Sequence, residues 1–178
     1  MAKIYQIVLV SLLSLAVLTS SIVGIWLGVR NTELGPHPDS DWELMITGNI
    51  VGGDFNLTMG EITEMNFYKQ KYTIRGSTTT TNVYLGVSLD YLFTNEININ
   101  ETVDTVVFVS EDERDMSFSI AEITSNGTNI IAYAIDGEYL LNQSQGGSGY
   151  LRLIIPPESE EDFNGPKCLK WIIEIRFI

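Results

Sequence analysis

The residue types that most often carry chemistry are scarce in this chain. It has one histidine, His37, and one cysteine, Cys168. It has no phosphate-cradling Gly-Lys-Ser/Thr loop, no Cys-x-x-Cys pair and no His-Glu-x-x-His sequence. Because His37 lies in a Gly- and Pro-containing stretch ahead of the domain, hydrolase triads that need a domain histidine are excluded. These patterns leave the catalytic residues unknown.

Cys168 lies between Lys167 and Lys170. Nearby positive charge favours a reactive thiolate. The alternative is a packed, unreactive thiol. The alternating apolar positions that follow Cys168 favour this second interpretation.

Two acidic stretches offer carboxylates. Residues 158–162 could ligate calcium, but they lack the regular spacing of oxygen ligands in a calcium loop and are interpreted as a solvated loop. Residues 111–115 surround Arg114 between two predicted strands, and they are interpreted as a polar turn, with a ligand-facing loop as the alternative. No metal ligand is predicted.

Residues 31–178 are strongly acidic, with eight lysines and arginines against 23 aspartates and glutamates and a formal charge of −15. Nucleic acid and anionic lipid headgroups need a basic surface, so both are excluded as partners. A small molecule or a protein of the cell envelope remains as the predicted partner.

An uncharged apolar run extends from Ile4 to Val29, between Lys3 and Arg30. At about 1.5 Å per residue, a helix of this length reaches ~39 Å, more than the ~30 Å of bilayer hydrocarbon. A cleaved signal peptide is the alternative, because small residues at 19–21 could form its cleavage site. The run continues well past a signal core, which favours a retained transmembrane anchor over residues 1–30.

Lys3 ahead of the span and a long acidic domain behind it predict a single-pass protein of the cell membrane, with the C-terminal domain outside. The membrane, contacted through residues 4–29, is therefore a predicted partner. Four Asn-x-Ser/Thr sequons agree with an exported glycoprotein. They are at Asn56, Asn100, Asn126 and Asn142.

The elements that must position the candidate residues are mostly strands. Short β-type runs recur between turn signals, at 42–50, 66–74, 105–109, 129–135, 150–155 and 169–178. Two of them, 105–109 and 129–135, are continuously apolar, as in strands buried on both faces. The last run keeps period two, which predicts one face made of Trp171, Ile173, Ile175 and Phe177.

Helical signals are brief. Thr58 and Glu61 form a capping box for a helix over 58–65, and Ser88 is a cap for a turn over 87–93. Residues 31–41 contain two X-Pro steps and no apolar periodicity, which predicts a linker. The chain is therefore predicted to be α+β and β-dominated, with one domain over 42–178.

Several short pieces follow one another along this domain. They are Trp-x-Leu-x-Ile-x-Gly at 42–48, Leu-Thr-x-x-Glu-Ile at 57–62, Tyr-x-Gly-Val-x-Leu at 84–89, Val-x-Val-Ser-x-Asp at 107–112, Asp-Gly-Glu-x-Leu at 136–140, Leu-Arg-Leu-Ile-Ile-Pro at 151–156 and Lys-Trp at 170–171. In order and spacing they resemble the sulfite-oxidase-type molybdopterin-binding domain, over roughly Trp42 to Phe177. The resemblance implies that fold, a molybdopterin cofactor and oxidoreductase chemistry.

The sequence differs from this family at the residue that ligates the metal. In cofactor-loaded members, a cysteine thiolate upstream of the Gly-Val-x-Leu segment holds the molybdenum, as a soft metal site requires. The corresponding stretch, 72–84, has no cysteine. Cys168 is expected in a different part of the fold, where it is a poor substitute.

Two basic positions of the family are retained, Arg152 and Lys170, and the resemblance implies that they meet the pterin phosphate. The alternative is that both are ordinary outward-facing strand residues. The family's histidine five residues before this arginine falls on Gly147, and its proline falls on Tyr150. The implied cofactor site is therefore only partly retained.

These observations predict a membrane-anchored extracytoplasmic domain of the oxidoreductase molybdopterin-binding type, acting as a binding or structural module that has lost the metal-ligating cysteine. One alternative is a molybdopterin-dependent oxidoreductase with non-cysteine ligation, for example by hydroxyls of residues 78–81. Another is an adhesion or cell-envelope β-domain unrelated to that family.

Overall fold

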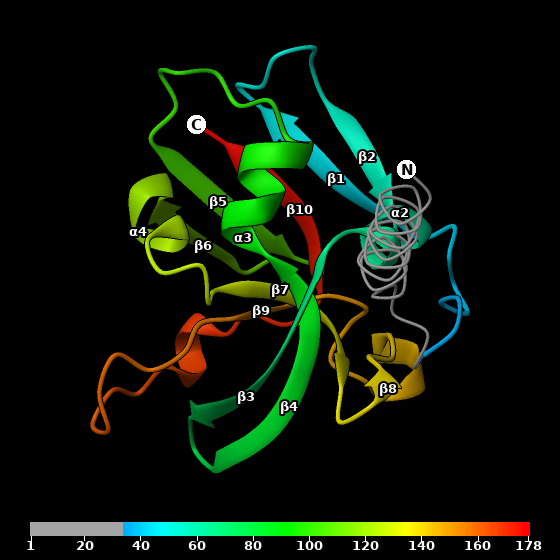
Figure 1. Ribbon diagram of the computed structural model, residues 1–178, viewed down its shortest axis with the longest axis vertical. Coiled ribbons are helices and arrows are strands. Elements are labelled where there is room, and N and C mark those ends of the chain that lie inside the picture. The colour runs from blue at the N-terminus through cyan, green and yellow to red at the C-terminus, as the bar shows by residue number, and fades with distance from the viewer. Residues whose placement is uncertain (1–33) are drawn as a thin grey trace, which may run out of the picture. The chain divides into compact units, whose positions relative to one another are not determined.

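Two five-stranded β-sheets organise residues 34–178, the part of the chain that the computed structural model describes. The first sheet has the order β2-β1-β10-β5-β6. Its strands are β1 (Glu43–Gly48), β2 (Phe55–Thr58), β5 (Thr105–Ser110), β6 (Asp115–Ser119) and β10 (Ile172–Phe177). Strand β10 pairs parallel with β1 and antiparallel with β5, so the C-terminal strand lies in the middle of this sheet (Figure 1).

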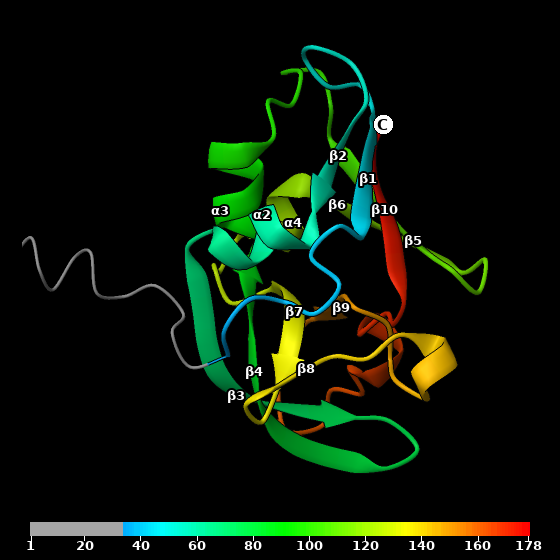
Figure 2. The same ribbon diagram turned by 90° about the vertical axis from the view of Figure 1, so that its right-hand side faces the viewer.

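The second sheet has the order β3-β4-β7-β8, and β9 also pairs with β7. Its strands are β3 (Phe67–Arg75), β4 (Thr79–Ser88), β7 (Ile130–Ile135), β8 (Glu138–Tyr139) and β9 (Arg152–Ile154). All of these pairs are antiparallel. The far end of the β3–β4 hairpin projects away from the first sheet (Figure 2).

The helices are short. They are α2 (Met59–Glu64), α3 (Leu89–Tyr91), the π-helical turn η1 (Leu92–Glu96), α4 (Ile120–Thr124) and the 3-10 turns η2 (Gln143–Gln145) and η3 (Gly165–Lys167). The predicted capping box is confirmed, because the Glu61 amide donates to Thr58 Oγ1 at 3.1 Å and the Thr58 amide donates to Glu61 Oε2 at 2.8 Å. Ser88 caps α3 as predicted.

The main core draws fully buried side chains from both sheets. They include Ile46, Phe108 and Ile175 from the first sheet and Val87, Ile131 and Leu153 from the second. Burial of each such side chain stabilises the fold by about 1.5–3 kcal/mol. This core between the sheets is the main source of stability.

A smaller cluster, called the outer cluster below, covers the opposite face of the second sheet. Its buried members are Tyr72, Ile74, Tyr84, Ile130, Ala132, Ile154 and Cys168. Successive residues of a strand point to opposite faces. Tyr84 therefore joins the outer cluster while Leu85 joins the main core.

The sequence predicted one buried face for the last strand. This prediction is correct for its C-terminal residues and wrong for its N-terminal residues. Ile175 and Phe177 are in the main core, but the core residue before them is Ile172, and Ile173 is only partly buried. The pairing with β5 shifts between Ile172 and Glu174, as at a β-bulge. A bulge inserts one residue and turns the following side chains to the other face.

The β-dominated α+β class is confirmed, and every predicted strand is present. The sequence did not predict β2, β4, β6, β8 or α4. Among the described residues, no helix has the length and apolar character that crossing a bilayer requires. The anchor predicted over residues 1–30 lies outside the described residues.

Residues 34–41 form turns that pack against the domain. His37 is only 3% exposed, and its ring meets the rings of Tyr139 and Tyr150 at centroid distances of 4.5 and 5.4 Å. Burial lowers the pKa of His37, so the ring is neutral at neutral pH. The prolines of residues 31–41 led to the prediction of a linker that includes His37. Proline content does not indicate whether a segment packs against the domain.

Candidate functional site

Arg152 begins β9 beside Ala132 of β7, on the face of the outer cluster. Its guanidinium carbon lies 5.9 Å from the centroid of the Tyr84 ring, and Nη1 is 3.4 Å from the Tyr84 hydroxyl. The Nε atom of Arg152 is buried and has no hydrogen-bond partner among the described residues. An unsatisfied buried donor on a charged group is costly, and a hydrogen bond from it to an acceptor would remove that cost.

Lys170 lies just before β10, and its Nζ atom is 5.8 Å from the centroid of the Trp171 ring. Its pKa is lowered, first by burial and then by the positive charges of Arg152 and Arg114. Arg152 and Lys170 therefore share one electrostatic environment although different elements carry them. The positive charge of Arg152 therefore influences Lys170, the second position that the resemblance retained.

Arg114 is a third cation that the sequence assigned only to a polar turn. It lies between β5 and β6 and forms an ion pair with Asp112 at 2.8 Å. Ser110, on the same hairpin, contacts both the Asp112 carboxylate at 2.6 Å and the Lys170 carbonyl oxygen at 2.8 Å. In the sequence, Arg114 could be noticed only as an arginine inside an acidic stretch. That pattern does not show which residues surround its side chain.

Tyr84 and Cys168 form the apolar side of this site. Burial raises the pKa of the Tyr84 hydroxyl, and the charge of Arg152 partly offsets that rise. Burial also raises the pKa of the Cys168 thiol, which is 4% exposed. The sequence expected Cys168 in a different part of the fold, but the structure places it in the outer cluster with Tyr84.

The residues fit a phosphate better than they fit a thiolate-held metal. Cys168 Sγ lies 3.5 Å from the Ile155 amide nitrogen and 3.6 Å from the Ile155 carbonyl oxygen. A thiol packed in this way with a raised pKa is a structural group. Arg152 and Lys170 supply the donors and charge that a phosphate requires.

The hydroxyls of residues 78–81 do not join this site. Thr78 precedes β4, residues 79–81 begin it at the hairpin end, and all four residues are exposed. At about 3.3 Å per residue along a strand, they lie roughly 10–20 Å from Tyr84. They are badly placed to ligate a metal beside Arg152.

The backbone leaves no room for a side chain at Gly147, the position that the resemblance aligns with a histidine. A Cβ atom added to Gly147 would lie 2.0 Å from the Leu141 carbonyl oxygen. Any side chain here would therefore require the loop to move. The Tyr150 hydroxyl contacts Asp39 Oδ2 at 2.8 Å and Asn142 Nδ2 at 2.9 Å.

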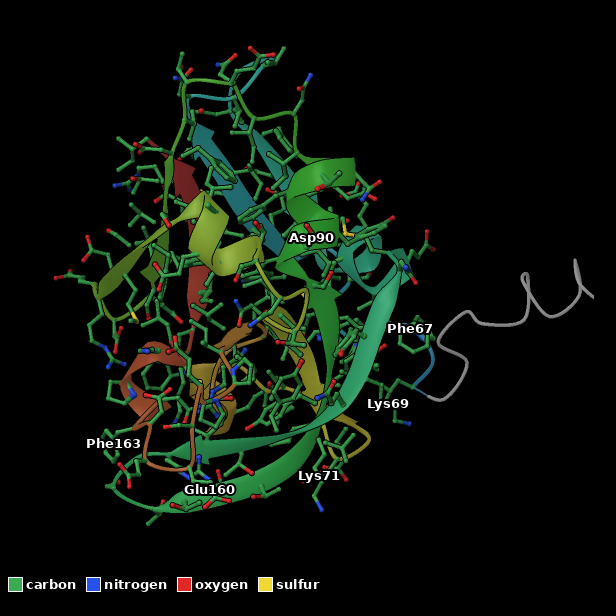
Figure 3. All side chains as sticks on the ribbon, turned by 60° about the vertical axis from the view of Figure 1, so that its left-hand side comes forward. Phe67, Lys69, Lys71, Asp90, Glu160 and Phe163 are labelled. Carbon is green, nitrogen blue, oxygen red and sulfur yellow. The ribbon has the colours of Figure 1, made fainter. Side chains whose placement is uncertain are left out.

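The acidic stretch at 158–162 is mainly exposed, as expected of a solvated loop. Figure 3 shows Glu160 on this stretch and Phe163 just after it, apart from Lys69 and Lys71 of β3. Within residues 34–178, no group of three or more His, Cys, Asp or Glu side chains has the arrangement of a metal site.

No family model matches the sequence, and no curated protein matches it. Among solved structures, the fold is similar to the crystal structure of the sulfane dehydrogenase SoxCD from Paracoccus pantotrophus, with a TM-score of 0.62 and 15% sequence identity. The match covers 81% of this chain and 40% of that chain. At this identity the likeness shows the fold alone, which is similar to the molybdopterin-oxidoreductase type.

Proposed function

We propose that this chain is a membrane-anchored, extracytoplasmic binding module that holds a phosphorylated anion at Arg152 and Lys170. The observation that carries the proposal is the buried Nε atom of Arg152, which has no partner among the described residues. Leaving such a donor unsatisfied costs about 1–3 kcal/mol or more. An anion that accepts from Nε offsets this cost.

The local charge supports an anion at this position. Residues 31–178 carry a formal charge of −15, so most of the surface repels anions. Arg152 and Arg114 add local positive charge near Lys170, whose pKa is lowered first by burial and then by these two charges. A bound phosphate offsets these positive charges and accepts charge-assisted hydrogen bonds.

The anchor part of the proposal rests on the uncharged apolar run from Ile4 to Val29 and on its length. It places the binding site outside the cell membrane. The absence of a cysteine from 72–84 and the packed state of Cys168 support a module without a thiolate-held metal.

The test uses the full-length chain in a mild non-ionic detergent and calorimetric titration with inorganic phosphate and pyrophosphate. We expect saturable binding that Arg152→Met or Lys170→Met weakens at least about tenfold, the value of one charge-assisted hydrogen bond. Lys71→Met is the matched control, because it removes an exposed charge from β3. Equal losses in all three variants would mean that net charge, not this site, governs binding.

The second candidate function is a molybdopterin-dependent oxidoreductase, favoured by the structural likeness to a sulfane dehydrogenase. Elemental analysis for molybdenum and tungsten, together with pterin fluorescence of the denatured protein, separates the two. Stoichiometric metal with pterin would establish this second function. Phosphate binding without either agrees with the binding module.

A further inference from the structure

A pocket of about 620 Å³ opens beside Trp171. It is distinct from the anion site, because neither Arg152 nor Lys170 lines it. Its lining residues are Trp42, Glu111, Asn142, Ser144, Gly149, Tyr150, Trp171, Ile172 and Ile173. Three of the lining residues are therefore aromatic, and one, Glu111, is acidic.

The aromatic walls are fixed in position. The rings of Trp42 and Tyr150 meet at 61° with centroids 5.4 Å apart, so two walls stand at an angle to each other. The Trp171 indole N–H donates to the Gly147 carbonyl oxygen at 3.1 Å. The contacts of the Tyr150 hydroxyl with Asp39 and Asn142 further fix the Tyr150 ring.

The backbone at Trp171, the residue just before β10, adopts a left-handed conformation. Its φ of 54° is rare for a large side chain. The Trp171 amide donates to the Ser148 carbonyl oxygen at 2.9 Å, and the Trp171 carbonyl accepts from the Glu111 amide at 2.8 Å. A Cβ atom on Gly149 would lie 2.5 Å from Trp171 Cα, so glycine permits this close approach.

We infer that this pocket binds a small organic cation of the quaternary-ammonium or methylated-amine class. Aromatic faces attract cations through the ring quadrupole. The Glu111 carboxylate adds charge, and so does Asp39 behind Tyr150. Lys170 Nζ lies 5.8 Å from the Trp171 centroid, so its positive charge opposes a second cation at that ring.

The overall charge of the domain favours the same ligand. With a formal charge of −15 on residues 31–178, the domain concentrates cations near its surface. A neutral saccharide would also stack on aromatic rings, but it would gain nothing from this charge. The dependence of binding on ionic strength therefore separates the two ligand classes.

The experiment titrates the full-length chain in non-ionic detergent with tetramethylammonium and with choline, by calorimetry and tryptophan fluorescence. We expect saturable binding in the millimolar range that weakens as salt is added. Glucose is the neutral comparison. The inference is overturned by absence of saturable tetramethylammonium binding, or by glucose binding as tightly with no salt dependence.

Two glutamates of one turn provide a matched pair of variants. Glu111→Gln should weaken tetramethylammonium binding about three- to fivefold, the effect of one exposed ion pair. Glu113→Gln removes the same charge outside the pocket lining and should leave the affinity unchanged. If both variants weakened tetramethylammonium binding equally, the effect would come from the overall charge of the domain, and the inferred cation site would be wrong.

Lys170→Met separates this inference from the proposed anion site. It removes a positive charge beside Trp171, so it should strengthen tetramethylammonium binding while it weakens phosphate binding. If phosphate does not bind but tetramethylammonium does, the proposed anion site is wrong and the inferred cation pocket is not affected. Unchanged or weakened cation binding in Lys170→Met would contradict the assigned electrostatics.

Discussion

The two apolar clusters on either side of the second sheet differ in chemistry. The main core consists almost entirely of aliphatic residues and phenylalanine, whereas the outer cluster contains Tyr72, Tyr84 and Cys168 among its seven buried members. Arg152 also lies on the outer side, over Tyr84. Since alternate residues of one strand serve the two clusters, stability and the proposed anion binding are assigned to neighbouring side chains of β4.

Substitutions of the adjacent residues Leu85 and Tyr84 test this division, and Leu85→Ala has the largest expected effect on the free energy of unfolding. Leu85→Ala opens a cavity in the main core and should lower the free energy of unfolding by about 2–5 kcal/mol. The folded fraction should keep its phosphate affinity. Tyr84→Phe should cost less than about 1.5 kcal/mol, because it removes one long hydrogen bond and keeps the ring. Urea denaturation measures both values, and similar losses would contradict the division.

Asn164 links the outer cluster to the segment that covers it. Its side chain is fully buried, accepts from the Arg75 amide at 2.8 Å and donates to the carbonyl oxygens of Thr73 and Ile155 at 3.2 and 2.6 Å. Asn164→Ala leaves these groups unsatisfied and should cost about 2–3 kcal/mol.

The same variant should expose Cys168 to thiol reagents, because the covering segment loses its link to β3. The rate of modification under native conditions measures this opening. Asn98→Ala, at an exposed position, is the matched control and should change neither stability nor thiol reactivity. An unchanged modification rate in Asn164→Ala would show that other contacts hold the segment.

Arg152→Met should have a smaller effect on stability, and of the opposite sign to Leu85→Ala. Removing a partly buried charge with an unsatisfied donor should leave the free energy of unfolding unchanged or raise it by up to about 1 kcal/mol. Added phosphate should stabilise the wild type and not this variant. Thermal unfolding with and without phosphate measures both effects, and a loss above about 2 kcal/mol would identify Arg152 as a structural residue.

The sequence predicted the elements with strong local signals. The capping box of Thr58 and Glu61 depends on residues three apart, and the apolar runs of β5 and β7 follow from burial on both faces. The sequence missed β4, whose first half is a polar run of threonines. A strand of this kind is held by pairing with β3 along its whole length, which is not a local property.

The site was predictable only in part, because it depends on long-range packing. The resemblance supplied Arg152 and Lys170, but no local signal indicated that Arg114 would influence Lys170 or that Cys168 would pack with Tyr84. The period of the last strand likewise predicted the wrong face for Trp171, because the bulge before Glu174 follows from pairing with β5. Its ring therefore belongs to the pocket wall and not to the regular face.

Glu174 is the buried charged residue of the first sheet, and it gives the smallest expected effect. Its carboxylate accepts from Arg176 Nε at 2.9 Å, from Arg176 Nη2 at 2.8 Å and from the Thr47 hydroxyl at 2.5 Å. These bonds hold the pKa of Glu174 below its ordinary value, with the Arg176 bonds contributing most. The ionised form is therefore favoured in the folded state.

A lowered folded-state pKa fixes the sign of the pH dependence. The contribution of Glu174 is fully present above the ordinary glutamate pKa and is lost as the pH falls through the lower folded-state value. Glu174→Gln should thus cost up to about 1 kcal/mol at neutral pH, discounted for the exposure of Arg176. The difference from wild type should shrink as the pH falls below about 4.

Urea denaturation of both proteins across this pH range measures the difference directly. Glu64→Gln removes one exposed carboxylate and controls for the change in net charge. A Glu174→Gln deficit that persists unchanged into acid would mean that packing or the neutral hydrogen bond to Thr47, and not the charge, stabilises this position. In that case the ionisation of Glu174 would contribute little to the stability of the first sheet.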